Sequence, residues 1–152
     1  MYKEMRRKDR AMEPAEAQHM LEEADFGFLG MAGPDGQPYV VPLNHAIIDG
    51  YIVFHCATQG HKLDLIKANP LVSYAVCTEH EVQPKEITTK YRSAIAFGKA
   101  EIVEDPETKR SLLVALMGRL APGVPFSCGD DSIGAACVVR IKVNRVTGKK
   151  RG

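Results

Sequence analysis

One stretch of this sequence, Val53 to Lys67, carries the residues best suited to chemistry, and it reads as a strand, a turn and the start of a helix. His55 stands at the end of the apolar strand segment, and Gly60-His61-Lys62 opens the helix. The first turn of a helix presents unpaired backbone N–H groups and the positive end of the helix dipole. Because His61 and Lys62 add side-chain donors at that point, the pattern favours a pocket for a phosphate group.

Each of these features also has a purely structural explanation, and both explanations stay open here. Gly60 can serve only as a helix cap beside two solvated cations, since short tripeptide patterns also arise by chance. A histidine such as His55 is commonly a half-buried structural residue of a strand end. A histidine side chain can, however, also donate or accept a proton beside a redox centre.

Two further segments offer groups to an anionic ligand. Arg92-Ser93 begins a long apolar strand and reaches the pocket if that strand lies beside it; otherwise Arg92 packs its stem and keeps its head in water. Pro42 interrupts the strand predicted over residues 39–48, which indicates an edge strand or an irregular segment, with nearby backbone groups free to bond a ligand. The side chain of His45 is expected to pack across strands rather than to bind a ligand.

The elements expected around these residues are mostly strands. Asp49-Gly50 predicts a two-residue hairpin turn, and Gly98 indicates a bulge or bend inside its strand. Strands are predicted at 26–32, 39–48, 51–56, 71–78, 91–104 and 135–143. Three helices are expected: one that opens within residues 12–16 and runs to about 23, one from 60 or 61 to about 68, and one from 105 to about 118. The remaining segments are predicted to be a loop at 79–89, a surface loop or lid at 121–132 and a polar, basic tail at 144–152.

This order of elements predicts a mainly β fold, a closed or nearly closed antiparallel barrel with peripheral helices. An open sheet would leave apolar segments such as 94–97 exposed at an edge, which closure of the barrel avoids. The length fits one domain over residues 1–152.

Composition and charge exclude several classes of function. Hydrophobic residues make up 45% and charged residues 26% of the chain, as in ordinary globular proteins. The net charge of +1 gives no strong attraction to nucleic acid or a membrane, and no apolar run is long enough to span a bilayer. The basic N-terminus lacks the apolar segment of a secretory signal, so a cytoplasmic protein is expected.

Metal and nucleophile motifs are missing from the sequence. The five histidines do not show metal-ligand spacing, and no Gly-x-Ser-x-Gly elbow or Walker loop occurs, so no metal site is predicted. Four cysteines are scattered without a Cys-x-x-Cys pair, which argues against zinc and against structural disulfides. Buried free thiols are expected instead.

Taken together in their order and spacing, five segments resemble the pyridoxamine 5′-phosphate oxidase-like FMN-binding split barrels, and most of all the 5-nitroimidazole-resistance reductases. The similarity extends over nearly the whole chain. The segments are Met5-Arg6-Arg7-Lys8, Pro38 to Leu43, Phe54 to Asp64, Tyr91 to Ala100, and Thr147-Gly148-Lys149.

The resemblance implies a set of cofactor contacts. His55 and Cys56 match the strand-end pair that contacts the flavin, and His61 and Lys62 match the Arg-Lys pair that binds the phosphate. Ser93, next to Arg92, matches a polar residue that closes the phosphate site. Histidine in place of arginine at position 61 keeps a donor but makes the phosphate affinity more sensitive to pH. Backbone groups along the isoalloxazine ring and ribityl chain would come from Val40, Val41, Pro42, Leu43, Asn44 and His45.

The implied protein is an FMN-dependent oxidoreductase that forms a homodimer with FMN between the subunits, with His55 as the residue that handles a proton. Nitroimidazole-type or other flat small molecules are the candidate substrates. Pyridoxamine phosphate is not expected, because the substrate-binding C-terminal segment of the oxidases has no counterpart after Thr147. A flavin- or haem-binding split barrel without catalysis, acting as a carrier or sensor, is the alternative, and a deazaflavin-using relative is a third possibility.

Overall fold

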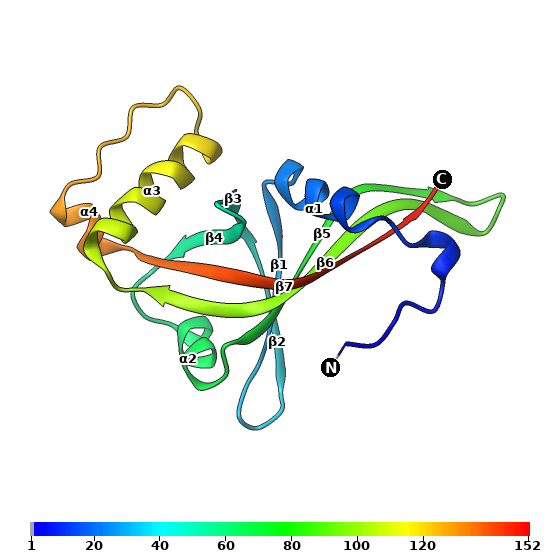
Figure 1. The fold of residues 1–152 in the computed structure, drawn as a ribbon, viewed down its shortest axis with the longest axis horizontal. Coiled ribbons are helices and arrows are strands. Elements are labelled where there is room, and N and C mark those ends of the chain that lie inside the picture. Colours follow the sequence, from blue (N-terminus) through cyan, green and yellow to red (C-terminus); the bar gives the residue numbers. More distant parts are fainter. Residues whose placement is uncertain (1) are drawn as a thin grey trace.

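Seven strands form one antiparallel sheet in the order β2-β1-β5-β6-β7-β4-β3 in the computed structural model of the protein, which describes residues 2–152 (Figure 1). Four α-helices and one 3₁₀ turn accompany the sheet. The elements are η1 (Lys8–Arg10), α1 (Pro14–Glu23), β1 (Phe26–Ala32), β2 (Pro38–Asn44), β3 (Ala46–Ile48), β4 (Tyr51–Cys56), α2 (His61–Ala68), β5 (Leu71–Gln83), β6 (Thr88–Val103), α3 (Pro106–Leu120), α4 (Asp130–Ala135) and β7 (Cys137–Arg151).

The sheet curls until its two edges approach each other. β2 and β3 occupy opposite ends of the strand order, yet only His45 separates them in the chain. One residue spans only about 3.5 Å, so the two edges must lie close together where the chain crosses from one to the other. The predicted mainly β split barrel of six or more strands is therefore confirmed, and the sheet has seven strands.

Two buried clusters lie on the two faces of this curled sheet. The inner cluster contains α1, α2 and the inward side chains of the strands, for example Leu29, Phe54 and Ala96. A smaller cluster forms where α3 covers the outer face around Val53 and Val138. Figure 1 shows α3 and α4 at the end of the sheet opposite the C-terminus.

Several local predictions are confirmed by the backbone. Asp49 and Gly50 both have positive φ angles, 52° and 81°, as a type I′ hairpin turn between β3 and β4 requires. At Gly98 the β6–β7 register shifts, and an added Cβ would lie 2.9 Å from Ile141 Cγ2 as well as against the Lys142 carbonyl. The irregularity predicted at Gly98 is therefore present, but its extra residue is Asn144 of β7 and not a residue of β6. The missing side chain of Gly98 lets the two long strands approach closely there.

Three predicted boundaries are wrong. The strand expected over 39–48 is broken at His45, whose N–H donates to the Asp25 carbonyl (3.1 Å) as the chain changes edges. The loop expected over 79–89 is mostly a hairpin arm, because β5 runs to Gln83 and β6 begins at Thr88. The short helix α4 lies partly inside the loop predicted over 121–132.

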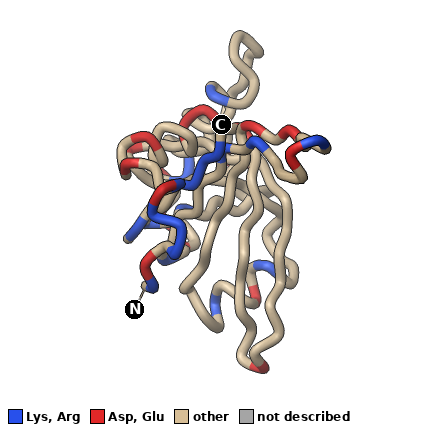
Figure 2. Tube along the Cα trace, turned by 90° about the vertical axis from the view of Figure 1, so that its right-hand side faces the viewer, with Lys and Arg blue, Asp and Glu red and all other residues tan. Residues whose placement is uncertain are grey.

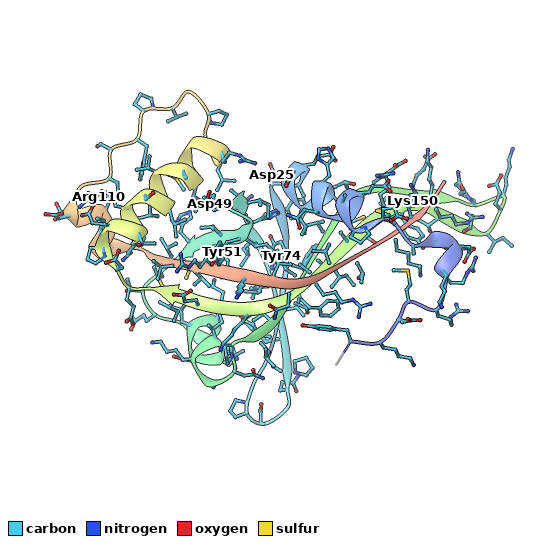
Figure 3. All side chains as sticks on the ribbon, in the orientation of Figure 1. Asp25, Asp49, Tyr51, Tyr74, Arg110 and Lys150 are labelled. Atoms are coloured by element: carbon cyan, nitrogen blue, oxygen red, sulfur yellow. The ribbon has the colours of Figure 1, made fainter. Side chains whose placement is uncertain are left out.

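The basic tail predicted over 144–152 is also wrong, because β7 continues to Arg151 and pairs with β6 as far as Tyr91. Its polar side chains find partners that a sequence pattern does not reveal. Lys150 Nζ lies 2.9 Å from the Glu16 carboxylate on α1, and Figure 3 shows Lys150 beside that helix.

Within residues 2–152, no helix has the length and apolar character needed to cross a membrane.

Candidate functional site

A gap in the hydrogen-bonded ladder of the barrel creates the candidate site. β3 pairs with β4 only as far as Val53, so Phe54, His55 and Cys56 pair with β7 alone. In the part of the chain that the structure describes, no strand pairs with the outer edge of β2 either. Between these two edges and the start of α2 lies a cavity of about 170 Å³, which we call the seam cavity. It is lined by Tyr39, Val41, Cys56, Ala57, Gln59, Gly60, His61, Lys62 and Leu63.

Local backbone geometry leaves the start of α2 open to a ligand. Gly60 occupies the N-cap with φ of 149°, a conformation that side chains rarely adopt, and no side chain caps the helix. The first amides of α2 are therefore not satisfied by a capping group. Together with the dipole, they form the kind of donor set that binds an anion.

The side chains of His61 and Lys62 at this helix start each lie against an aromatic ring. The His61 ring meets the Tyr39 ring edge-on with centroids 4.8 Å apart, and Lys62 Nζ lies 5.9 Å from the Phe54 ring centroid. Within residues 2–152, neither His61 nor Lys62 makes a salt bridge. Both side chains therefore keep their donors for a ligand.

The Cys56 side chain lines the cavity as an uncharged thiol. Burial raises the pKa of Cys56 to about 11, the neighbouring Cys137 thiol acts in the same direction, and Lys62 opposes both. The thiol is therefore protonated at neutral pH. The expectation of buried thiols holds for Cys137 but is wrong for Cys77, which is exposed.

Strand alternation separates the remaining predicted contacts of β2. Val41 lines the cavity, and Leu43 faces the core, where its carbonyl oxygen lies 3.2 Å from the Tyr74 hydroxyl. Val40, Pro42 and Asn44 point to the opposite, exposed face. Pro42 does lie in an edge strand, as its position predicted.

The side chain of His45 does not face a ligand. It is buried, and both ring nitrogens are used: Nε2 lies 2.9 Å from the Leu21 carbonyl and Nδ1 lies 2.6 Å from the Tyr74 hydroxyl. His45 therefore belongs to the structure of the barrel, and only its backbone remains a candidate contact.

The structure places His55 outside the seam cavity. Neighbouring residues of a strand point to opposite faces, and Cys56 faces the inside of the barrel. His55 is exposed and shares the outer face with Val53. Within residues 2–152 its side chain forms no salt bridge, and it does not line the cavity with His61 and Lys62.

Arg92 and Ser93 are not brought to the cavity within one chain. Arg92 Nη2 forms an ion pair with the Glu16 carboxylate of α1 at 2.7 Å. Ser93 is opposite Cys77 and Lys149 in the ladder, on the outer face. Its strand β6 is three strands away from β2, which is roughly 14 Å along the sheet.

The outer face near Ser93 carries an unusual apolar surface, which we call the outer patch. Four apolar residues lie side by side across four neighbouring strands. In this row Phe28 of β1 is opposite Pro42 of β2 on one side and Ala75 of β5 on the other, and Ala75 is opposite Ile95 of β6. Apolar areas of this kind mark interaction surfaces. Figure 2 shows the β1–β2 hairpin almost without charged residues. The exposed members of the patch are Phe26 (50% exposed), Phe28 (45%), Val40 (60%), Pro42 and Ile95 (40%).

The sequence contains a pattern that indicates this patch, although the strand predictions were not based on it. Apolar residues occupy both alternating positions in 26–32 and 38–43, a pattern typical of strands covered on both faces. Tyr39, whose ring positions His61, was also missed as a site residue. It stands at the same parity of β2 as Val41, so alternation places both on the cavity side.

Comparisons with known proteins agree with this architecture. A family model described as pyridoxamine 5′-phosphate oxidase matches residues 13–150. A candidate 5-nitroimidazole antibiotic resistance protein from Bacteroides thetaiotaomicron is 27% identical, with a TM-score of 0.79 over 91% of this chain and 85% of that chain. A conserved hypothetical protein from Mycobacterium tuberculosis is 26% identical, with a TM-score of 0.79 over 97% of this chain and 90% of that chain.

A more distant structure extends the likeness of fold alone. The FAD and haem binding protein from Mycobacterium smegmatis is 19% identical, with a TM-score of 0.82 over 95% of this chain and 75% of that chain. No curated protein matches the sequence.

Proposed function

Since the chain belongs to the pyridoxamine 5′-phosphate oxidase family, we propose that it is an FMN-dependent oxidoreductase that binds the cofactor phosphate at the start of α2. The observation that carries this proposal is the uncapped helix start at Gly60, flanked by the free donors of His61 and Lys62. When bound, FMN supplies the redox chemistry, accepting electrons from a reductant and passing them to a substrate.

The residues present fit the phosphate end of the cofactor. Backbone amides, an imidazole and an ammonium group are all donors, and no carboxylate lines the seam cavity. At about 170 Å³ the cavity is smaller than the roughly 300–1,000 Å³ typical of sites for whole ligands. The isoalloxazine ring therefore belongs outside it, with the backbone of β2 along its path.

A second copy of the chain would complete this site. The outer patch leaves large apolar side chains in water, and Ser93 borders it on the same face. We expect two copies to cover these faces in a homodimer, with FMN at the interface. Ser93, which is too far from the cavity of its own chain, would reach a phosphate only across that interface.

His55 is the proposed proton-handling residue. It is exposed at the free end of β4, one position before the Cys56 that lines the cavity, so it is accessible to a substrate bound outside. Imidazole exchanges protons near neutral pH, as a reduction that consumes protons requires.

Nitroimidazole-type compounds are the first acceptors to test, because one similar protein is named for 5-nitroimidazole antibiotic resistance. A non-catalytic flavin or haem carrier is the second candidate, since the fold is shared with a protein named for FAD and haem binding.

One purification and one assay distinguish the two candidates. The protein is reconstituted with FMN and the bound fraction is recorded by its absorbance in the blue. A reductant such as NADPH is then added with a nitroimidazole under nitrogen, and a sample without protein gives the background rate. Loss of the nitro absorbance over several turnovers supports the oxidoreductase. Bound FMN without turnover supports the carrier, and failure to retain FMN contradicts both flavin proposals.

A further inference from the structure

Two of the four cysteines are direct neighbours in the sheet. Cys56 ends β4, Cys137 begins β7, and the two residues are opposite each other in the antiparallel ladder. Both side chains point to the inside of the barrel, as do those of the next inward pair, Phe54 and Val139. No other two cysteines among residues 2–152 are paired in this way.

The backbone already has the spacing that a disulfide needs. Opposite residues of antiparallel strands have Cα atoms about 4.5 or 5.5 Å apart, depending on the ladder position. Both values lie inside the range of about 4.4–6.8 Å found for disulfides. A bond between the two sulfurs therefore requires side-chain rotation but no rearrangement of β4 or β7.

The pair is reachable from two sides. Cys56 is half-buried and lines the seam cavity, whereas Cys137 is 8% exposed and lines a second cavity of about 330 Å³. Leu63 borders both cavities. A molecule as small as hydrogen peroxide can therefore reach Cys56, and Cys137 lies next to it as a resolving thiol.

The electrostatic surroundings keep the pair reduced under mild conditions. The raised pKa of Cys56 leaves little thiolate at neutral pH, although Lys62 partly counteracts the effect of burial. Because peroxide and disulfide exchange both act on the thiolate, oxidation of Cys56 is expected to be slow and to need an excess of peroxide.

We propose that Cys56 and Cys137 are an oxidative modification site, at which peroxide converts the two thiols into an intramolecular disulfide. Peroxide first oxidises the Cys56 thiol to a sulfenic acid and releases one water molecule. The Cys137 sulfur then attacks the Cys56 sulfur, the S–OH bond breaks, and the hydroxide leaves with the thiol proton as a second water molecule. Two thiols lose two electrons and two protons, and a dithiol reductant reverses the step.

The disulfide would join the end of β4 to the start of β7. Cys56 leads directly into the turn that carries Gly60, His61 and Lys62, and Cys137 follows α4. A disulfide here therefore restrains the segment that opens the seam cavity. Its effect on FMN rests on the proposed function, whereas its formation does not.

The test uses a Cys77→Ser/Cys128→Ser background, in which only the pair remains. The purified protein is treated with hydrogen peroxide, denatured, alkylated with iodoacetamide and weighed by mass spectrometry. We expect the loss of two hydrogen atoms, no alkylation, and full recovery after dithiothreitol. The thermal midpoint of the oxidised protein should rise by at least about 5 °C.

Controls decide between this bond and other outcomes. Cys137→Ser in the same background should give no intramolecular disulfide. In the wild-type protein, protease mapping should find the peptides of Cys56 and Cys137 linked, a result that depends on no substitution. Two alkylated thiols after peroxide treatment, or links only between different chains, would overturn the proposal.

A parallel sample with saturating FMN separates this proposal from the proposed function. A phosphate at Lys62 should cover Cys56 and slow disulfide formation several-fold. If the disulfide forms at the same rate with FMN, the modification site stands and the placement of the cofactor phosphate fails.

Discussion

The Tyr74 hydroxyl donates a hydrogen bond to Nδ1 of His45 at 2.6 Å, inside the barrel where β2 passes into β3. The Nε2–H of His45 donates to the Leu21 carbonyl at 2.9 Å, which fixes the tautomer of the ring. The pair therefore links α1, β5 and the point at which the chain changes edges. The hydrogen bonds of this pair stabilise the closure of the barrel, in which the seam cavity is the remaining gap.

Removing the Tyr74 hydroxyl should destabilise the barrel. Tyr74→Phe leaves Nδ1 of His45 as a buried acceptor without a partner, which costs about 1–3 kcal/mol. Chemical denaturation measures the free energy of unfolding. Tyr51→Phe is the matched control, because the Tyr51 hydroxyl makes no hydrogen bond within residues 2–152. Equal effects of the two substitutions would contradict a special role of this pair.

Stability should fall on mild acidification. Burial lowers the pKa of His45 in the folded protein, whereas in the unfolded chain it titrates near pH 6.5. Below that pH the unfolded chain binds a proton that the folded protein does not, so the free energy of unfolding decreases as the pH falls. The contribution is complete above about pH 7.5 and declines through pH 6 and 5. His45→Gln should flatten this slope in denaturation curves recorded from pH 8 to 5.

Gly98, where β6 faces the bulge of β7, should not tolerate a side chain. Gly98→Ala places a Cβ against the Lys142 carbonyl and Ile141, an overpacking that typically costs about 1–3 kcal/mol. Gly118 in α3 is the control, since nothing lies within 4 Å of its added Cβ. Gly118→Ala should be neutral or stabilise the helix by up to about 1 kcal/mol. Thermal unfolding of both variants tests the difference.

The outer patch predicts the oligomeric state. Phe28→Glu places a charge in the middle of the apolar face and should convert a dimer to a monomer in analytical ultracentrifugation. Val114→Glu, at an equally exposed apolar position on α3, should leave the dimer intact. A monomeric wild-type protein at micromolar concentration would remove the basis for a shared site.

The sequence predicted the barrel well because its turns and strand periods are local signals. The Asp49-Gly50 turn and the helix start at Gly60 need backbone angles that few other residue types adopt. The residue types at these positions are therefore enough to predict the turn and the helix start. The continuation of β7 through Lys149 and Arg151 was missed, because its polar residues are stabilised by β6 and by Glu16 of α1. Such partners lie far away in the sequence.

The candidate site was predicted only in part for a similar reason. Val41, Cys56, His61 and Lys62 do meet at the seam cavity, because β2 and β4 approach each other there. Ser93 does not, because its strand β6 lies three strands from β2 in the sheet order. The opposite orientations of His55 and Cys56 follow from strand alternation. The sequence is therefore sufficient to predict that only one of these two side chains faces the cavity.

The central claim is that Lys62 and the start of α2 bind the phosphate of FMN, and the contrast between FMN and riboflavin tests it most directly. The wild-type protein should bind FMN at least about 10-fold more tightly than riboflavin, which lacks the phosphate, because charge-assisted hydrogen bonds are worth roughly 1.5–3 kcal/mol. Lys62→Met should remove most of this preference, and Lys67→Met, near the other end of the same helix, should keep it. Equal affinity of the wild-type protein for FMN and riboflavin, measured by quenching of flavin fluorescence, would contradict the account.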